Sequence, residues 1–416
     1  MNFKYGFGKG FIEFNIEESN VLMELRQNKV NIELTGEDEV RRALDNPIGS
    51  EKLSKIVKPG EKTVIITSDI TRPMPSKVVL PPVIEELLKA GLKYDDITVV
   101  FALGSHRKHT EAEKRYLVGD EIYEKVKCID SDASDCVHLG TTSYGTPVDI
   151  FSVVANADRR ICLGNIEYHY FAGYSGGLKA IMPGVSTRDA IQSNHSNMVK
   201  EESRAGALDD NPVRLDIEEV ANFVPVDFIV NVVLDENKRI IKAVAGHHKL
   251  AHREGCKFLD SLYKVEIPEK ADIVVTTPGG YPKDINLYQA QKALENAKHA
   301  VKDGGVIILV ASCSEGVGGE IFERWLLDAE LPDNLIRDIQ RNFVLGGHKA
   351  AAIAMLLKKA RIFLVSDMDS EFVKRLFMEP FNDVNTALEE AFRIKGNNAK
   401  VILMPYGGST LPVAAG

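Results

Sequence analysis

Single apolar and polar residues alternate at the start of the chain, whereas further on short apolar runs alternate with longer amphipathic segments. Within residues 5–36, the segments GFGKGFIEFNI and KVNIEL alternate in this way, which predicts an antiparallel hairpin or a small sheet. From residue 62 onward, short β-branched runs take turns with helix-length amphipathic segments such as PPVIEELLKAG. This alternation predicts an α/β fold, with mainly parallel sheets flanked by helices and a small N-terminal β-hairpin region.

The strand–helix alternation occurs in two blocks, which predicts two α/β domains. The strands predicted for the two blocks are 62–67, 96–103, 159–164 and 227–234, then 272–277, 305–312, 361–366 and 400–405. Between the blocks, the helical stretch HHKLAHREGCKFLDSLYK is followed by VEIPEKAD, which has the proline and charge of a linker. We therefore place an N-terminal domain at 1–266 and a C-terminal domain at 267–416, a division that suits a chain of 416 residues.

Composition and charge limit the classes of molecule that the protein is expected to bind. The 51 basic and 60 acidic residues give a net charge of −9, which argues against a nucleic-acid partner and favours small molecules. No apolar run approaches the length of a membrane span, and the start MNFKYGFGKG lacks the pattern of a signal peptide. The five cysteines are scattered and form no CxxC, so we expect neither a disulfide framework nor a thiolate zinc site. We expect a cytoplasmic protein without a membrane partner.

Charged and polar side chains follow four of the predicted strands. These segments and their candidate residues are SDITRPMPS (Asp69, Arg72), GSHRKHT (His106, His109), NIEYHYFAGYSGGLK (His169, Lys179) and PGGYPKDINLYQAQK (Gln289, Lys292). In open parallel sheets, ligands bind at the carboxyl ends of the strands. Four such polar strand ends predict an active site in the cleft between the two domains.

Plainer, structural interpretations of the first two segments stay open at this point. Arg72 could simply pair with Asp69 in a proline turn. The segment TEAEKRYL begins with a capping box, and we expect His109 beside it to be solvated rather than catalytic. For His106, which is nearer to the strand, a structural and a catalytic role carry equal weight.

The other polar segments also have alternatives. Gln289 and Lys292 share one helix face, which Asn286 or Asp284 would cap, and donors near that helix N-terminus suit an anionic ligand. The segment SEGVGGE (314–320) could contact a phosphate, although neither GxxxxGK[ST] nor GxGxxG is present for a nucleoside triphosphate or a diffusible dinucleotide.

One further pair of histidines has a spacing found among metal ligands. His248 and His252 are four residues apart on a predicted helix. No third ligand stands near them in the sequence, so we interpret the pair as a solvated helix face.

Taken together, six segments are similar in order and spacing to the nickel-dependent lactate racemase family. They are SDITRPMPS, GSHRKHT, EYHYFAGYSGGLKAIMPG, NHSN, LDDNP and GGYPKDINLYQAQK, within roughly residues 60–350. The stretch from Lys179 to His195 is the most specific part. Members of this family carry a nickel pincer nucleotide, a nicotinate-derived mononucleotide whose two sulfur groups hold nickel against the ring carbon.

The resemblance implies a role for each candidate residue. Lys179 would tether the cofactor as a thioamide, in a bend whose glycines give clearance to a bulky nucleotide, and His195 would be the protein's ligand to nickel. His106 and His169 would be the two acid/base residues. The other implied roles are orientation of the cofactor site (Asp69), binding of the substrate carboxylate and oxygen (Arg72, Gln289 and Lys292) and packing beside the substrate (Phe171 and Tyr288).

The implied activity is racemisation of a short 2-hydroxy acid such as lactate, with cofactor-synthesis enzymes as partners in maturation. Hydride transfer through a 2-keto acid suits this substrate, because the α-proton beside a carboxylate is only weakly acidic. Two opposed histidines suit it too, because a pKa of about 6.5 lets each give and take protons near neutrality.

Two alternatives stay open beside this interpretation. The same chemistry could act on a larger 2-hydroxy acid, such as malate, phenyllactate or a sugar acid, and Leu178, where family members associated with lactate often have arginine, bears on that choice. The other is a non-catalytic carrier of nickel or nucleotide, which would need Lys179 and His195 but no pair of histidine bases.

Overall fold

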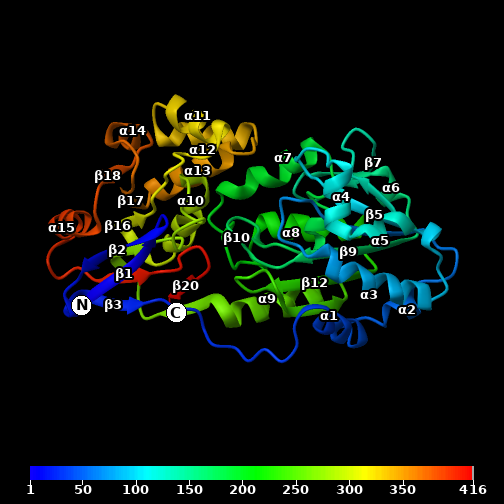
Figure 1. The fold of residues 1–416 in the computed structure, drawn as a ribbon. Helices are drawn as coiled ribbons and strands as arrows, with labels where there is room; N and C mark the ends of the chain where they lie inside the picture. The colour runs from blue at the N-terminus through cyan, green and yellow to red at the C-terminus, as the bar shows by residue number, and fades with distance from the viewer. Residues whose placement is uncertain (415–416) are drawn as a thin grey trace. The chain divides into compact units, whose positions relative to one another are not determined.

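The structure is a computed structural model that describes residues 1–414, and the chain forms two compact units (Figure 1). The first unit combines residues 1–29 with the chain from Leu262 onward, and the second consists of residues 30–261. Each contains a six-stranded, largely parallel sheet with flanking helices, which confirms the predicted fold class. Within residues 1–414, no helix combines the length and the apolar character needed to cross a bilayer.

The sheet of the second unit has the strand order β13-β12-β9-β4-β5-β6, and only the β12–β13 neighbours are antiparallel. Its strands are β4 (Thr63–Ser68), β5 (Ile97–Ala102), β6 (Lys127–Asp130), β9 (Arg159–Asn165), β12 (Phe228–Leu234) and β13 (Ile240–Gly246). Two antiparallel pairs lie outside it, β7 (Cys136–Thr141) with β8 (Pro147–Phe151) and β10 (Tyr168–His169) with β11 (Gly173–Tyr174). The helices are α1 (Gly36–Asp45), α2 (Leu53–Ile56), α3 (Ser76–Lys89), α4 (Glu111–Val118), α5 (Asp120–Lys125), α6 (Ser152–Ala155), α7 (Arg188–Ser196), α8 (Pro212–Glu219) and α9 (Leu250–Tyr263).

The central strands of this sheet are apolar on both faces, as expected for parallel strands covered on two sides. Side chains alternate between the faces along each strand, and Ile65 and Ile161 pack in one core cluster with Val40 of α1 and Val83 of α3. A 3₁₀ turn at Gly177–Ala180 contacts β4 and β9. The segment that carries Lys179 is therefore held directly on the sheet.

The sheet of the first unit has the order β18-β17-β16-β15-β19-β3, and all its neighbours are parallel. Its strands are β3 (Val21–Glu24), β15 (Ala271–Thr276), β16 (Val301–Val310), β17 (Ala360–Val365), β18 (Glu379–Phe381) and β19 (Val401–Met404). Two pairs lie outside it, β1 (Asn2–Phe7) with β2 (Gly10–Asn15) and β14 (Lys264–Ile267) with β20 (Leu411–Ala414). The helices are α10 (Leu287–Ala297), α11 (Glu320–Asp328), α12 (Pro332–Arg341), α13 (Gly347–Leu357), α14 (Ser370–Arg375) and α15 (Val384–Lys395).

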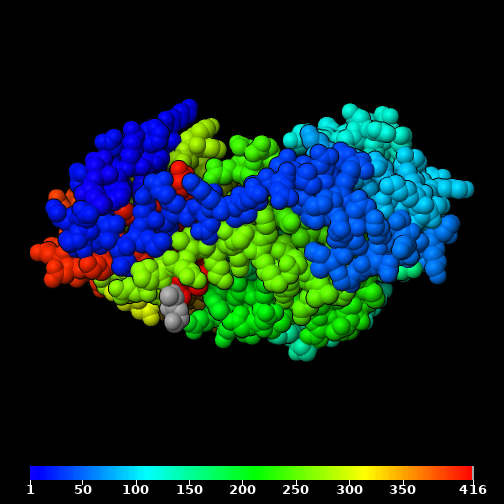
Figure 2. All heavy atoms as spheres, turned by 90° about the horizontal axis from the view of Figure 1, so that it is seen from below, coloured from blue at the N-terminus to red at the C-terminus, as the bar shows by residue number. Residues whose placement is uncertain are grey.

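The two faces of this sheet are covered by different parts of the chain. Ile307 belongs to a core cluster with Leu294 of α10, whereas the next residue, Ile308, belongs to a cluster with Phe14 of the β1–β2 hairpin and Leu388 of α15. Figure 2 shows the dark-blue hairpin residues beside the orange C-terminal helix. The first and last segments of the chain thus share one apolar core.

The extent of the N-terminal domain differs from the predicted 1–266, because residues 1–29 pack in the first unit. The strand β3 pairs in parallel with β19, and the Asn15 N–H donates to the Asn385 side chain at 3.0 Å. The β1–β2 hairpin is confirmed, but the prediction that KVNIEL (29–34) is also a strand is wrong, since these residues form no regular element. Their alternation has no partner strand to pair with.

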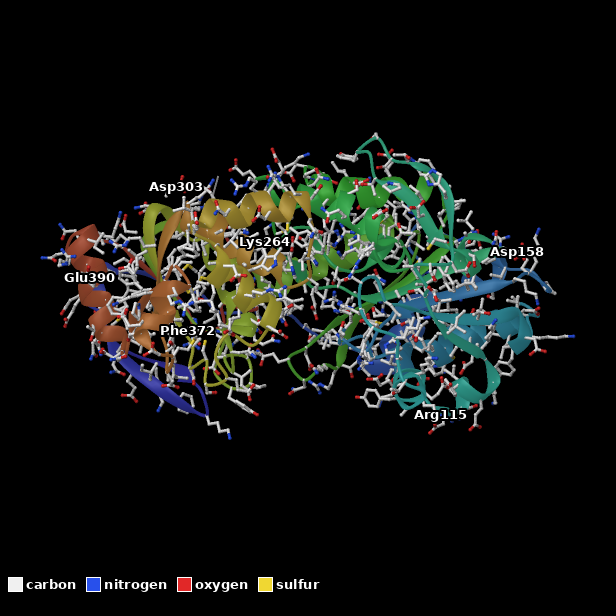
Figure 3. The ribbon with its side chains drawn as sticks, turned by 90° about the horizontal axis from the view of Figure 1, so that it is seen from above. Arg115, Asp158, Lys264, Asp303, Phe372 and Glu390 are labelled. Atoms are coloured by element: carbon white, nitrogen blue, oxygen red, sulfur yellow. The ribbon has the colours of Figure 1, made fainter. Side chains whose placement is uncertain are left out.

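Charged side chains lie on the outer surface of each unit. Figure 3 shows Arg115 and Glu390 pointing outward, and both take part in ion pairs. Arg115 lies 3.2 Å from Asp120 and 3.3 Å from Glu124, and Glu390 lies 2.6 Å from Arg393. Exposed pairs of this kind contribute little to folding, so the stability of both units rests mainly on their apolar cores.

We expect Gly173→Ala to destabilise the second unit by about 3 kcal/mol, from left-handed backbone strain plus a steric clash. Gly173 in β11 has a φ of +76°, and a Cβ there would lie 1.8 Å from the carbonyl oxygen of Ala207. Urea unfolding measures the loss. The matched control is Gly60→Ala, at φ +84° with nothing within 4 Å, where strain alone should cost about 1–2 kcal/mol. Equal losses in both variants would contradict the steric explanation.

Candidate functional site

Three neighbouring strand ends in the second unit carry most of the predicted site residues. The strands β9, β4 and β5 are adjacent and parallel, so the loops that follow them leave the same edge of the sheet. Asp69 follows β4, His106 follows β5, and His169 and Lys179 follow β9. Their mutual contacts and charges show that this edge gathers them into one group.

Asp69 is a buried carboxylate that holds His106. Its Oδ2 lies 2.5 Å from His106 Nδ1, and the Thr71 hydroxyl donates to Oδ1 at 2.7 Å. Burial raises the pKa of Asp69, but the hydrogen bond and charge of His106, with Thr71 and the charge of Arg72, bring that pKa below its ordinary value. An ionised Asp69 only accepts, so Nδ1 of His106 carries a proton and a neutral ring presents a lone pair at Nε2. Asp69 pairs with His106 rather than with Arg72.

His109 is a structural residue, and the prediction that it is solvated is wrong. Its buried ring has Nδ1 2.6 Å from Asp130 Oδ1, and its Nε2 accepts the Ile70 N–H at 3.0 Å. Both ring nitrogens are therefore used to fasten the loop after β4 to the end of β6. The capping box at Thr110 is present as predicted. Of the two histidines in this segment, His106 is the one that can act as a base.

Phe171 is buried at the centre of the group. Its ring centroid lies 4.5 Å from that of His169 and 4.9 Å from that of His195, and Lys179 Nζ lies 6.0 Å from it. Asn211, in the LDDNP segment, donates to the Phe171 carbonyl at 2.9 Å. One aromatic ring thus connects three of the residues singled out in the sequence.

His169 is held in the opposite tautomer to His106. Its Nδ1 accepts the Ala172 N–H at 3.3 Å, so a neutral ring carries its proton on Nε2. Burial, followed by nearby positive charges that include Arg72 and Arg214, holds the pKa of His169 well below its ordinary value. His169 is therefore neutral at physiological pH and able to donate a hydrogen bond from Nε2.

Lys179 is a lysine without a counter-charge. Burial, then the charges of Arg214 and Arg72, hold its pKa well below the ordinary value. Among residues 1–414, no hydrogen bond or ion pair engages Lys179 Nζ. Arg214 is itself buried and donates to the carbonyl oxygens of Ala172 and Tyr174. Such surroundings favour the neutral amine, which is the nucleophilic form of lysine.

The glycines of this bend make room for the protein itself, which corrects the expectation that they clear space for a nucleotide. A Cβ on Gly176 would lie 2.8 Å from Asn231 Oδ1, and one on Gly184 would lie 2.2 Å from the Ala180 carbonyl oxygen. The tight bend around Lys179 is thus fixed by internal packing.

His252 supports the same bend, and the prediction that it belongs to a solvated face is wrong. Its buried ring lies against Gly177, where a Cβ would come within 3.0 Å of it. His252 Nε2 lies 2.8 Å from the Ser175 carbonyl oxygen. This histidine is a packing partner of the segment that carries Lys179.

His195 lies in the last turn of α7 and is buried. Its Nδ1 is 2.9 Å from Asn194 Oδ1. Thr187 caps the start of α7 by accepting the Ala190 N–H. The NHSN segment is therefore helical, with His195 turned toward Phe171.

Gln289, Lys292 and Tyr288 lie in the first turns of α10, in the other unit. Asn286 caps this helix as predicted, since its Oδ1 accepts the Gln289 N–H at 3.0 Å. The N–H groups of residues 287 and 288 donate to the carbonyl oxygens of Gly316 and Val317. The SEGVGGE loop thus closes the helix N-terminus, and the donors there that could meet an anionic ligand are the side chains of Gln289 and Lys292.

Asp284, the other capping candidate, has a different role. Its buried Oδ2 accepts the N–H groups of Gly8 at 2.7 Å and Ser312 at 3.1 Å. Asp284 therefore ties the turn of the β1–β2 hairpin to the end of β16.

Sequence reasoning missed Lys349 of α13. Its Nζ donates to the Tyr288 carbonyl at 2.6 Å and to Gln291 Oε1 at 3.1 Å, and lies 4.1 Å from the centre of the Tyr288 ring. Burial, then the charge of Lys292, lowers the pKa of Lys349 to about 7. The available signal was a single lysine in an otherwise apolar helix, GHKAAAIAMLL.

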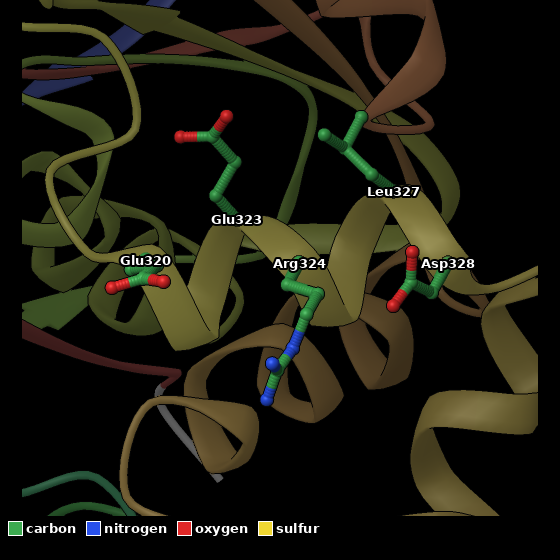
Figure 4. Close-up of a pocket in the computed structure, with 5 residues that line it drawn as sticks. All are labelled: Glu320, Glu323, Arg324, Leu327 and Asp328. Carbon is green, nitrogen blue, oxygen red and sulfur yellow. The ribbon is translucent and has the colours of Figure 1, made fainter.

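A surface hollow along α11 carries none of the predicted residues. Figure 4 shows Glu323 and Leu327 on one side of the helix and Arg324 pointing away from them. All the residues that line the hollow belong to α11, with Glu320 at one end and Asp328 at the other. It gathers no histidine and no buried charge, so we place the candidate site at the strand ends instead.

Comparison with known proteins agrees with the resemblance seen in the motifs. Residues 7–206 match the family model of the lactate racemase N-terminal domain, and residues 267–411 match that of the lactate racemase C-terminal domain. A lactate racemase of Thermoanaerobacterium thermosaccharolyticum is 35% identical over 422 residues, which cover 99% of each chain. A lactate racemase of Lactiplantibacillus plantarum is 36% identical over 384 residues, 90% of each chain.

Solved structures show the same relation. The lactate racemase apoprotein of T. thermosaccharolyticum matches with a TM-score of 0.88 at 34% identity, over 99% of this chain and 100% of that one. A protein of Thermotoga maritima matches with a TM-score of 0.61 at 16% identity, over 92% of this chain and 100% of that one, which shows a similar fold alone.

We expect His169→Gln to lose less stability on acidification than the wild type. The pKa of His169 is depressed in the folded protein, so below about 6.5 the unfolded chain binds a proton that the folded chain does not. Stability is therefore present above that pH and is lost as pH falls. Between about pH 7.5 and about pH 5.5, one such histidine costs about 1.4 kcal/mol. Urea unfolding at both values should show this loss reduced by that amount in the variant, and equal losses would contradict the assignment.

Proposed function

The chain belongs to the lactate racemase family, and from that premise we propose that it interconverts the enantiomers of a short 2-hydroxy acid, lactate or a near relative, with a tethered nickel pincer nucleotide. The observation that carries the proposal is the pair His106 and His169, whose neutral rings are held in opposite tautomers. One presents a lone pair at Nε2, which can accept a proton, and the other an N–H, which can donate a hydrogen bond to a substrate oxygen.

The two histidines exchange roles between the two directions of the reaction. His106 Nε2 takes the hydroxyl proton of one enantiomer, while Asp69 keeps the ring oriented and stabilises the imidazolium that forms. His169 supplies a proton for the other enantiomer once its own ring has been protonated, and the low pKa of that imidazolium favours release of the proton. A near-symmetric reaction needs a group of this kind on each side of the substrate.

Lys179 and His195 fit the requirements of the cofactor. The amine of Lys179 is unpaired within residues 1–414 and favours its neutral form, which suits a covalent tether. His195, beside Phe171, offers one imidazole donor, and residues 1–414 contain no cluster of three His, Cys, Asp or Glu side chains that could hold a metal. The proposal therefore draws the other donors from the cofactor. When bound, the nickel pincer nucleotide supplies a hydride acceptor and donor for the α-carbon.

The substrate contacts are proposed from residue chemistry and from the resemblance. Arg72 is exposed and close enough for its charge to act on His169 and Lys179, so it suits the substrate carboxylate. Gln289, Lys292, Phe171 and Tyr288 are the other proposed contacts.

Leu178 and His106 bear on the alternatives. Leu178 is buried with 2% of its surface exposed, so it presents no charged group to a substrate, and a larger 2-hydroxy acid is the second candidate. A non-catalytic carrier of nickel or nucleotide would need only a tether and a metal ligand. It would not need a histidine base such as His106, which a carboxylate holds in place.

We expect wild-type protein produced together with cofactor-synthesis enzymes to carry the mass of the tethered nucleotide. Lys179→Arg should carry none, because a guanidinium stays protonated and does not form the thioamide. Intact-mass spectrometry measures both. The matched control is Lys200→Ala, at an exposed lysine of the same unit, which should retain the full added mass. Added mass on Lys179→Arg, or none on the wild type, would overturn the tether.

We expect little deuterium at the α-carbon when the loaded enzyme racemises a single enantiomer in deuterated water. The hydrogen that leaves this carbon is returned to it without exchanging with solvent, whereas the hydroxyl proton passes through His106 and His169. Chiral chromatography with mass spectrometry separates the two product enantiomers and counts their deuterium. Full incorporation would instead indicate abstraction of the α-proton by a base.

A further inference from the structure

Asp216 is a fully buried carboxylate on α8 that neutral groups surround. It accepts hydrogen bonds from the Thr142 hydroxyl at 2.6 Å, the Thr146 hydroxyl at 2.7 Å and the Asn194 side-chain amide at 2.7 Å. No ion pair to Asp216 occurs within the part of the chain that the structure describes. Burying a carboxylate with neutral donors alone is costly, which calls for a reason to keep it there.

Two acceptors, Asp216 and the Val213 carbonyl, fix which way the Asn194 amide faces. Asn194 is itself fully buried, and its Nδ2 donates both to Asp216 Oδ2 and to the Val213 carbonyl oxygen at 3.1 Å. A backbone carbonyl only accepts, and the carboxylate already receives the threonine hydroxyls, so the NH₂ group must face both. Asn194 Oδ1 is thereby turned toward His195, 2.9 Å from Nδ1.

An amide oxygen at this position determines the tautomer of the ring. The oxygen cannot donate, so His195 Nδ1 must carry the proton, and in the neutral ring the lone pair is then on Nε2. A free histidine side chain in water favours the other tautomer, with the proton on Nε2. The surroundings of His195 therefore work against the intrinsic preference of the ring.

We propose that Asp216 is a positioning residue, which acts through Asn194 to hold His195 in the tautomer whose Nε2 can bind nickel. This rests on the proposed function, in which His195 is the protein's ligand to the metal. A protonated Nε2 has no lone pair for a metal, and fixing the tautomer through the second ring nitrogen is a general device of metal-binding histidines. Here the amide of Asn194 stands between the carboxylate and the ring.

The test measures the tautomer of His195 directly, in the full-length apoprotein without nickel or nucleotide. Long-range ¹H–¹⁵N spectra of protein labelled with ¹⁵N-histidine distinguish protonated from unprotonated ring nitrogens, and His195→Gln assigns the signals. We expect the wild type to show Nδ1 protonated and Nε2 unprotonated. Asn194→Ala should move the ring predominantly to the Nε2–H tautomer.

Variants of Asp216 test the carboxylate itself. Asp216→Ala should give a mixture of both tautomers of His195. Without the carboxylate as an acceptor, the side-chain amide of Asn194 can flip and present its NH₂ group to His195. Asp216→Ser serves if the alanine variant does not fold, since a hydroxyl there is too short to reach Asn194. The matched control is Glu219→Ala on the same helix, whose carboxylate accepts the N–H and hydroxyl of Ser143 and should leave the tautomer unchanged.

An Nε2–H tautomer in the wild type, or an unchanged Nδ1–H tautomer in both Asn194→Ala and the folded Asp216 variant, would overturn the proposal. The proposed function fails separately, through the absence of tethered mass on the wild type. In protein loaded with the cofactor, Asn194→Ala should keep the tethered mass and lose nickel, as measured by elemental analysis. Full nickel content in that variant would also count against the proposal.

Discussion

Positive charge gathered around a buried lysine is the physical constraint on which the candidate site depends. Arg214 and Arg72 keep their charge under all physiological conditions, and both act on Lys179. Burial first, and nearby positive charges second, depress the pKa values of Lys179 and His169, so both groups favour their neutral forms. Without the arginines, Lys179 would more readily hold a proton and be a poorer nucleophile. The same field attracts anions, which both a nucleotide and a 2-hydroxy acid are.

Within that field, the partner of each Nδ1 decides what each histidine can do. A carboxylate directly on Nδ1 leaves His106 with a basic Nε2, and a second carboxylate with a backbone N–H consumes both nitrogens of His109. A backbone N–H on Nδ1 gives His169 a donor at Nε2, and an amide oxygen gives His195 a lone pair there. In each of these four histidines, the group on Nδ1 determines which ring nitrogen carries the proton of the neutral ring.

Much of the fold could be predicted from the sequence because its signals are local. Strand–helix alternation, the capping box at Thr110 and the Asn286 cap all depend on residues a few positions apart, and each is present. The strand ends were informative for the same reason, since adjacent parallel strands must deliver their loops to one edge. The roles carried over by resemblance, such as those of Lys179 and His195, stay predictions.

What the sequence could not provide is information about distant partners. His109 looked solvated because its neighbours in the chain are polar, yet Asp130, 21 residues away, buries it. His252 is held by Ser175, 77 residues earlier, and the segment KVNIEL has the pattern of a strand but no partner. The role of Asp216 was equally hidden, because its three donors come from two other segments of the chain.

The shared core of the first unit bears on how the protein is made. Residues 30–261 are continuous, so the second unit has all its strands available while the ribosome is still translating the other half. The first unit, by contrast, needs β3 from the start of the chain beside β19, which is among the last strands to emerge. Its sheet can be completed only at the end of synthesis. Until then, the first 29 residues lack the sheet against which they pack.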